Sequence, residues 1–382
     1  MFNYLFNTKK ILSRSRYPWI DYARGITILL VVYRHVFEGL GNVGEGSVSY
    51  SGLKYFNIFF FSFRMPLFFI VSGIFVGASL ARKGIGDYVT NRFQTIFYPL
   101  MLWGSIQITL QLAFAGYANA TREPMDYLNL IIEPRKLEQF WYLNALFFVS
   151  VLYALVHWYG KAKPWQQLVL GAIFYAIGGY CHVQGIKIGF LIDVLFFYLF
   201  FAVGHVFSDM VLNTKNYKWL SSWKTTLIAL PVFVLVQHLF TTINLNHQDD
   251  YYVQYKLPAV FALIALIGGA FVIQLSFLLQ ELNILRFLRV IGYHSLYIYV
   301  MHLMITAGTR AVMLKLFHVQ NIPVIMVVSI TVGVILPMIF YNIAERMGAW
   351  WLFTLKKPAT GTGGGQPSNN KEQPHKTVAV GS

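Results

Sequence analysis

Short charged segments divide this chain into apolar runs of about 20 residues, and that division restricts its fold more than any other feature. A helix rises about 1.5 Å per residue, so about 20 residues cross a hydrocarbon core about 30 Å thick. Only 12% of the residues are charged, whereas a soluble domain has about twice that share. The sequence therefore predicts an all-α fold, a polytopic membrane helix bundle.

We expect about ten transmembrane helices in this bundle. Basic residues lie mostly in the segments on one side, beginning with Lys9 and Lys10, and this asymmetry places both termini in the cytoplasm. The expected location is the plasma (inner) membrane, with a multi-pass topology. The ten segments comprise residues 19–40, 55–80, 96–115, 141–158, 165–182, 186–208, 222–241, 257–279, 292–314 and 323–344.

A membrane domain is expected over residues 19–345, preceded by a cytoplasmic N-terminal segment, 1–18. Residues 346–357 contain two adjacent tryptophans, which are typical of an interfacial segment. Residues 358–382 are rich in Gly, Pro, Asn and Gln and predict a disordered cytoplasmic tail. The net charge is +15, but the basic residues flank the spans instead of forming one solvated face. This placement argues against nucleic acid as a partner.

The first span contains five ionisable residues, an unusual concentration for a membrane helix. They are Asp21, Arg24, Arg34, His35 and Glu38. Each charge in a membrane span typically costs ~2.5–3.5 kcal/mol, so such side chains normally face protein or a wet cavity. They also interrupt the apolar stretch, which argues against a cleaved signal peptide.

Arg24 and His35 are 11 positions apart, which places them about 20° apart around a helix and roughly 16 Å apart along it. Arg24 then lies at the cytoplasmic boundary, where arginine suits phosphate or another anion. His35 lies near the outer face, where it can act as a general base with Glu38 one turn away. The alternative is a structural ion-pair network, with Asp21 holding Arg24 and Glu38 holding Arg34.

Several segments of the chain carry a family resemblance. Arg24, ten intervening residues and His35 form the first match, and residues 61–73 (FSFRMPLFFIVSG) form the second. Further matches are residues 140–143 (FWYL) and the pattern Ile-Gly…Ser-Leu-Tyr…His within residues 291–302. This ordered set, which extends over most of the chain, resembles the integral membrane acyltransferase 3 family.

The resemblance implies transfer of an acyl group, usually acetyl, from cytoplasmic acyl-CoA to an acceptor across the membrane. Acceptors in that family are usually hydroxyls of surface glycans or lipid-linked sugars. By the same resemblance His35 is the catalytic histidine and Arg24 takes part in donor binding or acyl passage. We group Glu38 with His35, and Asp21 with Arg24. Acyl-CoA, usually acetyl-CoA, is then a substrate, and no bound cofactor is expected.

The sequence departs from the family pattern at two positions. Arg64 stands where members often have histidine; it lies at the level of His35, so it either stabilises an oxyanion or pairs with Glu38. Arg92 matches the first of two arginines three apart, but Thr95 replaces the second, which removes one charge from the expected donor site. The tail is also too short for the hydrolase-like domain of some members. Transfer is therefore expected to finish in the membrane domain or on a separate extracytoplasmic protein.

Three polar residues of the ninth span, Ser295, Tyr299 and His302, are spaced i, i+4 and i+7 and share one helix face. They either line the cavity or form interhelical hydrogen bonds. Asp193 is a lone acid in the sixth span, and its partner is not visible from the sequence.

Three further residues complete the cavity-lining candidates. Arg34 lies beside His35, Trp141 opens the fourth span, and Ser72 lies near the end of the second-span motif. Ser72 is alternatively a small residue that permits close helix packing. The histidines show no H-E-x-x-H spacing, so no metal site is expected.

The sequence thus predicts a membrane enzyme that moves an acyl group from cytosolic acyl-CoA to a glycan hydroxyl outside. His35 would deprotonate the acceptor, although a covalent acyl-histidine intermediate is a second possible route. The rival prediction is a secondary transporter or flippase, for which a polar track is equally natural. Transporters tend to show paired, interrupted spans in two related halves, and none is apparent in this sequence.

Overall fold

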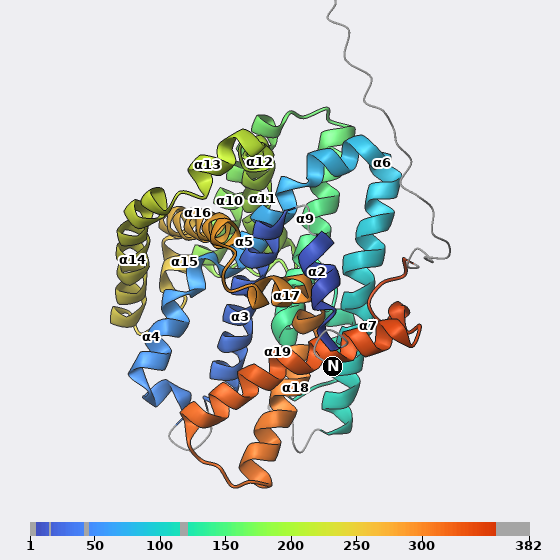
Figure 1. The fold of residues 1–382 in the computed structure, drawn as a ribbon, viewed down its shortest axis with the longest axis vertical. Coiled ribbons are helices and arrows are strands. Elements are labelled where there is room, and N and C mark those ends of the chain that lie inside the picture. The colour runs from blue at the N-terminus through green and yellow to red at the C-terminus, as the bar shows by residue number, and fades with distance from the viewer. Residues whose placement is uncertain (1–4, 15–16, 42–45, 115–120, 357–382) are drawn as a thin grey trace, which may run out of the picture.

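The computed structural model describes residues 5–14, 17–41, 46–114 and 121–356. Within these ranges all regular structure is helical and no strand occurs, so the predicted all-α helix bundle is confirmed (Figure 1). The expected tail, 358–382, lies outside the described residues.

The long helices form one bundle, and short helices connect them. The long ones are α3 (Pro18–Gly39), α5 (Phe61–Ile74), α6 (Val76–Arg92), α7 (Tyr98–Ala113), α9 (Trp141–Trp158), α10 (Pro164–Gln184), α11 (Leu191–Val206), α14 (Trp223–Asn246), α16 (Pro258–Leu282), α18 (Ser295–Lys315) and α19 (Ile322–Arg346). The shorter α-helices are α2 (Thr8–Arg14), α4 (Ser51–Phe59), α8 (Asp126–Asn129), α12 (Ser208–Leu212), α13 (Tyr217–Leu220), α15 (Tyr252–Lys256) and α17 (Phe287–Tyr293). Short 3-10 segments occur at Ser47–Ser49, Pro134–Phe140, Thr214–Asn216 and Trp350–Leu352, and a π-helical turn occurs at Phe93–Phe97.

Each of the ten expected spans falls on one or more of these helices. In the described ranges, seven helical segments are long and apolar enough to cross a membrane, and α11 is a shorter apolar helix. The chain is therefore a multi-pass membrane protein, while the number ten stays a prediction. Charged side chains interrupt α3, and it is not among the seven. The seven segments are Ser51–Ile74, Val76–Ala113, Pro134–Trp158, Trp223–Asn246, Pro258–Leu282, Ser295–Lys315 and Ile322–Arg346.

Two expected spans are interrupted in the structure. The second is divided at Phe60, which separates α4 from α5, and again at Phe75. The ninth is divided at His294, between α17 and α18. The buried His294 ring bonds through Nδ1 to the carbonyl of Val290 (2.7 Å) and through Nε2 to Asn342 of α19 (2.9 Å). The break is thus fixed by side-chain contacts that no local sequence pattern reveals.

Helix α3 occupies the centre of the bundle and packs against α5, α16, α17, α18 and α19 (Figure 1). Two glycines permit its closest approach to α17. A Cβ atom on Gly292 would lie 1.8 Å from the Asp21 carbonyl oxygen, and one on Gly25 would lie 2.1 Å from the Leu288 carbonyl oxygen. Small residues allow such backbone contact between membrane helices. The contact fixes the depth and rotation of α3, and with them the positions of its charged residues.

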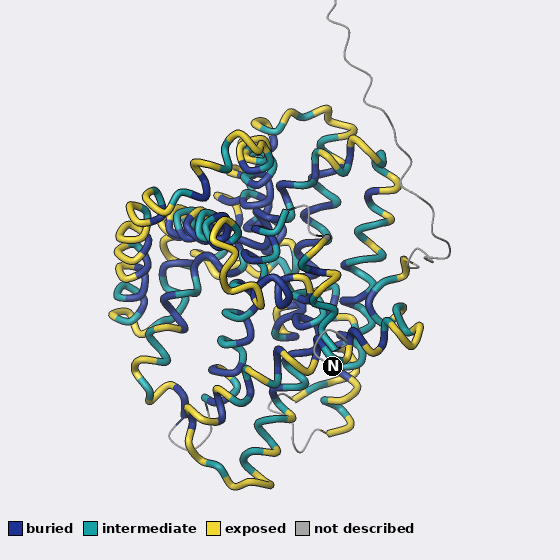
Figure 2. The backbone as a smooth tube through the Cα atoms, in the orientation of Figure 1, coloured by how far each residue is buried: buried dark blue, intermediate teal, exposed yellow. Residues whose placement is uncertain are grey.

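Burial follows the same arrangement. Figure 2 shows buried residues concentrated toward the centre of the bundle and exposed ones along its outer helices. On α14, the apolar Ile228 is 74% exposed. Such an apolar outer surface is the surface that lipid tails solvate. Charged residues at the centre therefore face protein or cavities, as the cost of placing them in lipid requires.

Candidate active site

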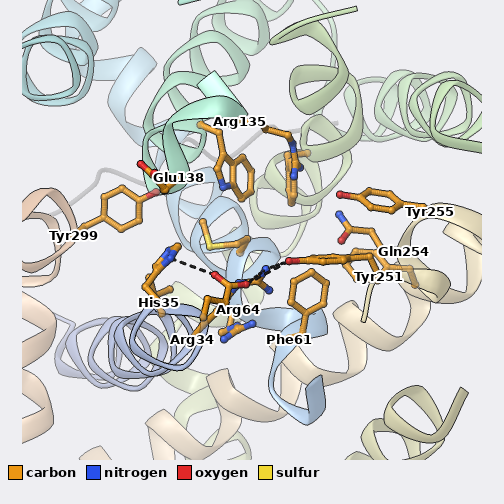
Figure 3. A pocket seen from close by; sticks show the side chains of 16 residues that line it. Arg34, His35, Phe61, Arg64, Arg135, Glu138, Tyr251, Gln254, Tyr255 and Tyr299 are labelled. Carbon is orange, nitrogen blue, oxygen red and sulfur yellow. Dashed lines mark hydrogen bonds and ion pairs between the residues drawn. The ribbon is translucent and has the colours of Figure 1, made fainter. Parts of the chain in front are cut away.

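A cavity of about 280 Å³ lies at the end of α3 that carries His35, and we call it the His35 cavity. It is bounded by α3, α5, α9, α11, α15, α16 and α18 together with the turn Pro134–Phe140. Side chains from these distant segments point into one space (Figure 3). Six of the residues singled out from the sequence line it: Arg34, His35, Glu38, Arg64, Trp141 and Tyr299.

His35 lies between a carboxylate and a second imidazole. Its Nδ1 is 3.6 Å from Glu38 Oε2, and its ring centroid is 5.2 Å from that of His302. His302 is fully buried, and its Nδ1 bonds to the carbonyl oxygens of Tyr299 (2.8 Å) and Ile298 (3.1 Å). Carbonyls only accept, so Nδ1 carries the hydrogen and Nε2 is an acceptor. That Nε2 has no hydrogen-bond partner among the described residues.

Glu38 also forms the ion pair that the structural alternative predicted. Arg34 Nη2 is 2.6 Å from Glu38 Oε1 and donates to the hydroxyl of Tyr251, which in turn donates to Glu38 (3.4 Å). Burial raises the pKa of Tyr251, which lies in the loop before α15, so its hydroxyl stays protonated. The network holds the Glu38 carboxylate beside His35, and it therefore has structural and positioning roles together.

Arg64 is buried and lacks a carboxylate partner. Its Nη1 donates to the carbonyl of Leu30 (2.9 Å), and no ion pair with Glu38 occurs in the described part of the chain. The buried Nη2 has no hydrogen-bond partner in those ranges. A positive donor that lines the cavity and remains available favours the oxyanion role over pairing with Glu38.

Asp193, the lone acid of the sixth span, pairs with Arg135. The guanidinium donates three hydrogen bonds to the Asp193 carboxylate, at 2.9, 2.9 and 2.5 Å. It also lies 4.4 Å from the ring centroid of Trp141, a favourable cation–π distance. Arg135 comes from the turn before α9 and lines the His35 cavity. The pair therefore anchors a connecting segment to α11 at the edge of the cavity.

Removal of Arg135 alone should destabilise the protein, because Asp193 is only 1% exposed and would be left as an unpaired buried charge. For Arg135→Leu we expect a loss of about 3–5 kcal/mol, measured by thermal unfolding of the detergent-solubilised protein. The double variant Arg135→Leu/Asp193→Leu should regain much of this loss. Equal unfolding temperatures for the single and double variants would show that the pair does not stabilise the fold.

Glu138 is a second cavity residue that sequence reasoning missed. Its backbone lies at φ 48° and ψ −103°, a conformation that residues other than glycine rarely adopt. Arg122 pairs with its carboxylate, and Gln107 donates to it (3.1 Å). The sequence offers one signal for it, the mixed charge of the segment 116–140, of which residues 116–120 lie outside the described ranges. The carboxylate is thus held at the cavity by side chains on two segments.

A second cavity, of about 230 Å³, lies near the other end of α3, and we call it the Arg24 cavity. Arg24, Ser72 and Arg92 line it, so the structure brings together three residues singled out separately from the sequence. Lys83 adds a third cation. The described residues that line this cavity include no carboxylate. The charge of the site therefore suits an anion.

Three of the proposed site residues, Asp21, Ser295 and His302, line neither cavity. His302 instead lies behind His35, with its ring 5.2 Å from the His35 ring. Ser295 lies in the first turn of α18, about 6 Å along the helix axis from Tyr299, so a shared face does not bring it to the cavity. Asp21 lies one turn before Arg24 and makes its closest backbone approach to α17. Close packing beside Ser72 is supplied by Gly73, where a Cβ atom would lie 2.0 Å from the carbonyl oxygen of Phe201.

No described residue lines both cavities. Tyr142 lies between them: its ring is 5.2 Å from that of Tyr299, which lines the His35 cavity, and its hydroxyl lies near Ser72 of the Arg24 cavity. The rings of Phe68 and Phe69 pack on Tyr142 at 5.4 and 5.3 Å. An aromatic layer thus separates the two cavities.

Groups of three or more His, Cys, Asp or Glu side chains that could hold a metal are absent from the ranges described. An imidazole beside a carboxylate can take a proton from a hydroxyl, and a guanidinium can stabilise negative charge on an oxygen.

Comparison with known proteins gives two kinds of match. Residues 17–342 match the model of a family described as an acyltransferase domain. Nodulation protein NolL of Mesorhizobium japonicum is 22% identical over 56% of this chain and 54% of its own length. Nodulation protein NolL of Sinorhizobium fredii is 23% identical over 53% and 52%. This chain spans about half the length of these curated relatives, and no solved structure matches it significantly.

Proposed function

This chain belongs to that acyltransferase family, which confirms the resemblance, and on this premise we propose that it transfers an acyl group from acyl-CoA to a glycan hydroxyl. The donor is acetyl-CoA, used as a substrate with no bound cofactor. The acceptor is an extracytoplasmic glycan or lipid-linked sugar. A separate extracytoplasmic protein is a further possible recipient of the acyl group.

The observation that carries the proposal is the pair of cavities at opposite ends of α3. One gathers Arg24, Lys83 and Arg92, and the other gathers His35, Glu38 and Arg64. We assign the Arg24 cavity to the cytoplasm, where acyl-CoA is available, and the His35 cavity to the outer side, with both termini cytoplasmic. The flexible arm of the donor then spans the aromatic layer around Tyr142 and carries the thioester to His35.

In the proposed reaction, the neutral imidazole of His35 takes the proton of the acceptor hydroxyl. The hydroxyl oxygen attacks the thioester carbonyl, and the negative charge that develops on the carbonyl oxygen is stabilised by Arg64. The carbon–sulfur bond breaks and the coenzyme leaves as thiolate, which accepts the proton held by His35. Glu38, 3.6 Å from Nδ1, stabilises the imidazolium formed in between.

The lining of the His35 cavity also suits a sugar acceptor. Trp141, Tyr251 and Tyr255 offer aromatic surface, and Gln254 and Glu138 offer polar groups. Apolar walls with a few placed polar groups are typical of sites for small molecules. These residues come from the Pro134–Phe140 turn, the start of α9, α15 and the residue before α15.

The direct test supplies labelled acetyl-CoA to membranes that contain the full chain and follows label into extracted envelope glycans. Membranes from the same cells without the chain are the control. We expect labelled glycan only where the chain is present. Unlabelled glycans would contradict the proposal, and export of a solute without consumption of acyl-CoA would support the transporter alternative instead.

Arg24→Ala should chiefly weaken use of the donor. A hydrogen bond to a charged group is worth about 1.5–3 kcal/mol, so KM for acyl-CoA should rise roughly 10- to 100-fold with a smaller change in kcat. The measurement is the initial transfer rate against acyl-CoA concentration. Arg286→Ala, at an exposed arginine before α17, is the control. An unchanged dependence on acyl-CoA would remove Arg24 from the donor site.

A further inference from the structure

Lys83 was not expected at the donor site, because the sequence places it eight residues before Asn91 and nine before Arg92. In a continuous helix, eight residues separate two positions by about 12 Å along the axis. The Lys83 ammonium nevertheless lies 3.3 Å from Asn91 Oδ1 and lines the Arg24 cavity. The chain must therefore fold back between these positions.

The fold-back occurs at Gly84, whose φ of 69° and ψ of 176° interrupt α6. This conformation lies in the region that glycine adopts readily and other residues adopt at a cost. It allows Lys83, on one side of the break, to reach the helix that carries Asn91 and Arg92 on the other. The glycine at this position thus allows a third positive side chain, Lys83, to line the cavity.

The same cavity shows unsatisfied polar atoms. Nε of Arg92 and the hydroxyl of Tyr88, which is 2% exposed, are buried without hydrogen-bond partners in the described ranges. Neither Lys83 nor Arg92 has a carboxylate within 4 Å in the part of the chain the structure describes. Buried polar groups normally have hydrogen-bond partners. Two donors without partners, next to positive side chains without a nearby carboxylate, therefore indicate that the cavity binds an anion.

Thr95 contributes no such donor. Its hydroxyl bonds to the carbonyl of Asn91 in its own helix (2.7 Å) and does not line the cavity. Residue 95 therefore does not provide the positive charge that the family pattern has at this position. Lys83 brings a positive charge to the same cavity from another segment. The cavity keeps three cations although one arginine of the pattern is replaced.

We propose that Lys83, brought into the Arg24 cavity by the chain reversal at Gly84, binds a phosphate group of the acyl donor in place of the arginine missing at residue 95. This inference rests on the proposed function, because it assumes that acyl-CoA occupies the cavity. Together Lys83, Arg24 and Arg92 form a cluster for the several phosphate charges of coenzyme A, with Tyr88 as an additional hydroxyl donor. Ammonium groups bind phosphate as point charges, and guanidinium groups bind it through two hydrogens.

The test compares ligands with and without phosphate. The full chain is placed in nanodiscs of neutral lipid, and binding of coenzyme A and of pantetheine, which lacks phosphate, is measured with transfer from their acetyl thioesters. For Lys83→Ala we expect about tenfold weaker binding of coenzyme A and unchanged binding of pantetheine. Lys83→Arg should retain most of the affinity. Arg82→Ala is the matched control, because Arg82 is exposed and does not line the cavity.

Gly84→Ala provides a second variant, which should weaken coenzyme A binding in the same way by straining the reversal. Equal affinity of Lys83→Ala and Arg82→Ala for coenzyme A, with wild-type transfer intact, would overturn the assignment of Lys83. Equal weakening of pantetheine would show a structural role and also overturn it. A Lys83 effect confined to nanodiscs with phosphatidylglycerol would assign the site to a lipid headgroup. Failure of the wild-type chain to bind coenzyme A or transfer acetyl would overturn the proposed function itself.

Discussion

Replacing His35 with alanine is expected to reduce acyl transfer by roughly 10²–10⁴-fold, the range that a positioned general base contributes. The acceptor hydroxyl would then lose its proton only to water, and Glu38 and His302 would flank an empty position. The measurement is the initial rate of labelled acetyl transfer in membranes at saturating acetyl-CoA. Binding of coenzyme A should be unchanged, because the Arg24 cavity shares no described lining residue with the His35 cavity.

The matched control for this prediction is His247→Ala. His247 is exposed after α14, stacks on Tyr252 and does not line the cavity. Its variant should retain the wild-type rate. Equal rates for His35→Ala and the wild-type chain would rule out the proposed role of His35. Accumulation of acetyl groups on the wild-type protein before acceptor is added, lost in His35→Ala, would indicate the covalent route instead.

The second large effect is expected for Arg64→Met. Removal of one donor to a developing oxyanion typically lowers kcat about 10²–10³-fold, and KM for acyl-CoA should change little. Stability should respond differently. Arg64 is 2% exposed and has no ion-pair partner in the described ranges, so its charge is costly to bury. Thermal unfolding of Arg64→Met should therefore occur at the wild-type temperature or above it.

This combination separates catalysis from packing. A fall in unfolding temperature parallel to the fall in rate would mean that Arg64 acts as a structural residue. Arg64→Lys should recover part of kcat, because an ammonium retains the charge but not the geometry of two guanidinium donors. A lysine variant as inactive as Arg64→Met would argue that position, and not charge, determines the effect.

The relation between Arg24 and His35 could be predicted from the sequence, because helix geometry fixes two positions on one helix. The same reasoning placed Arg64 at the level of His35, and both residues line one cavity. The same reasoning was wrong for Ser295. Ser295 shares a helix face with Tyr299, but it lies too far along the helix axis to reach the cavity. Helical periodicity therefore predicts on which side of a helix a residue lies. It does not predict how far along the helix a cavity extends.

Partners from distant segments could not be predicted. Arg135 reaches Asp193 across 58 positions, and Tyr251 reaches Arg34 across 217. Each contact depends on which helices pack side by side. The spacing of residues within one segment does not reveal this. Lys83 was missed for a different reason: the reversal at Gly84 lies within a segment that sequence reasoning treated as an ordinary connection between spans.

The aromatic layer around Tyr142 has a consequence for the energetics of the cell. A polar track open from end to end would let protons leak down the electrochemical gradient, where each elementary charge carries about 2.3 kcal/mol per 100 mV. Tyr142, Phe68 and Phe69 interrupt that track between the two cavities. Under the proposed function, the acyl group would cross this layer without opening a continuous polar path, so the membrane potential would be preserved.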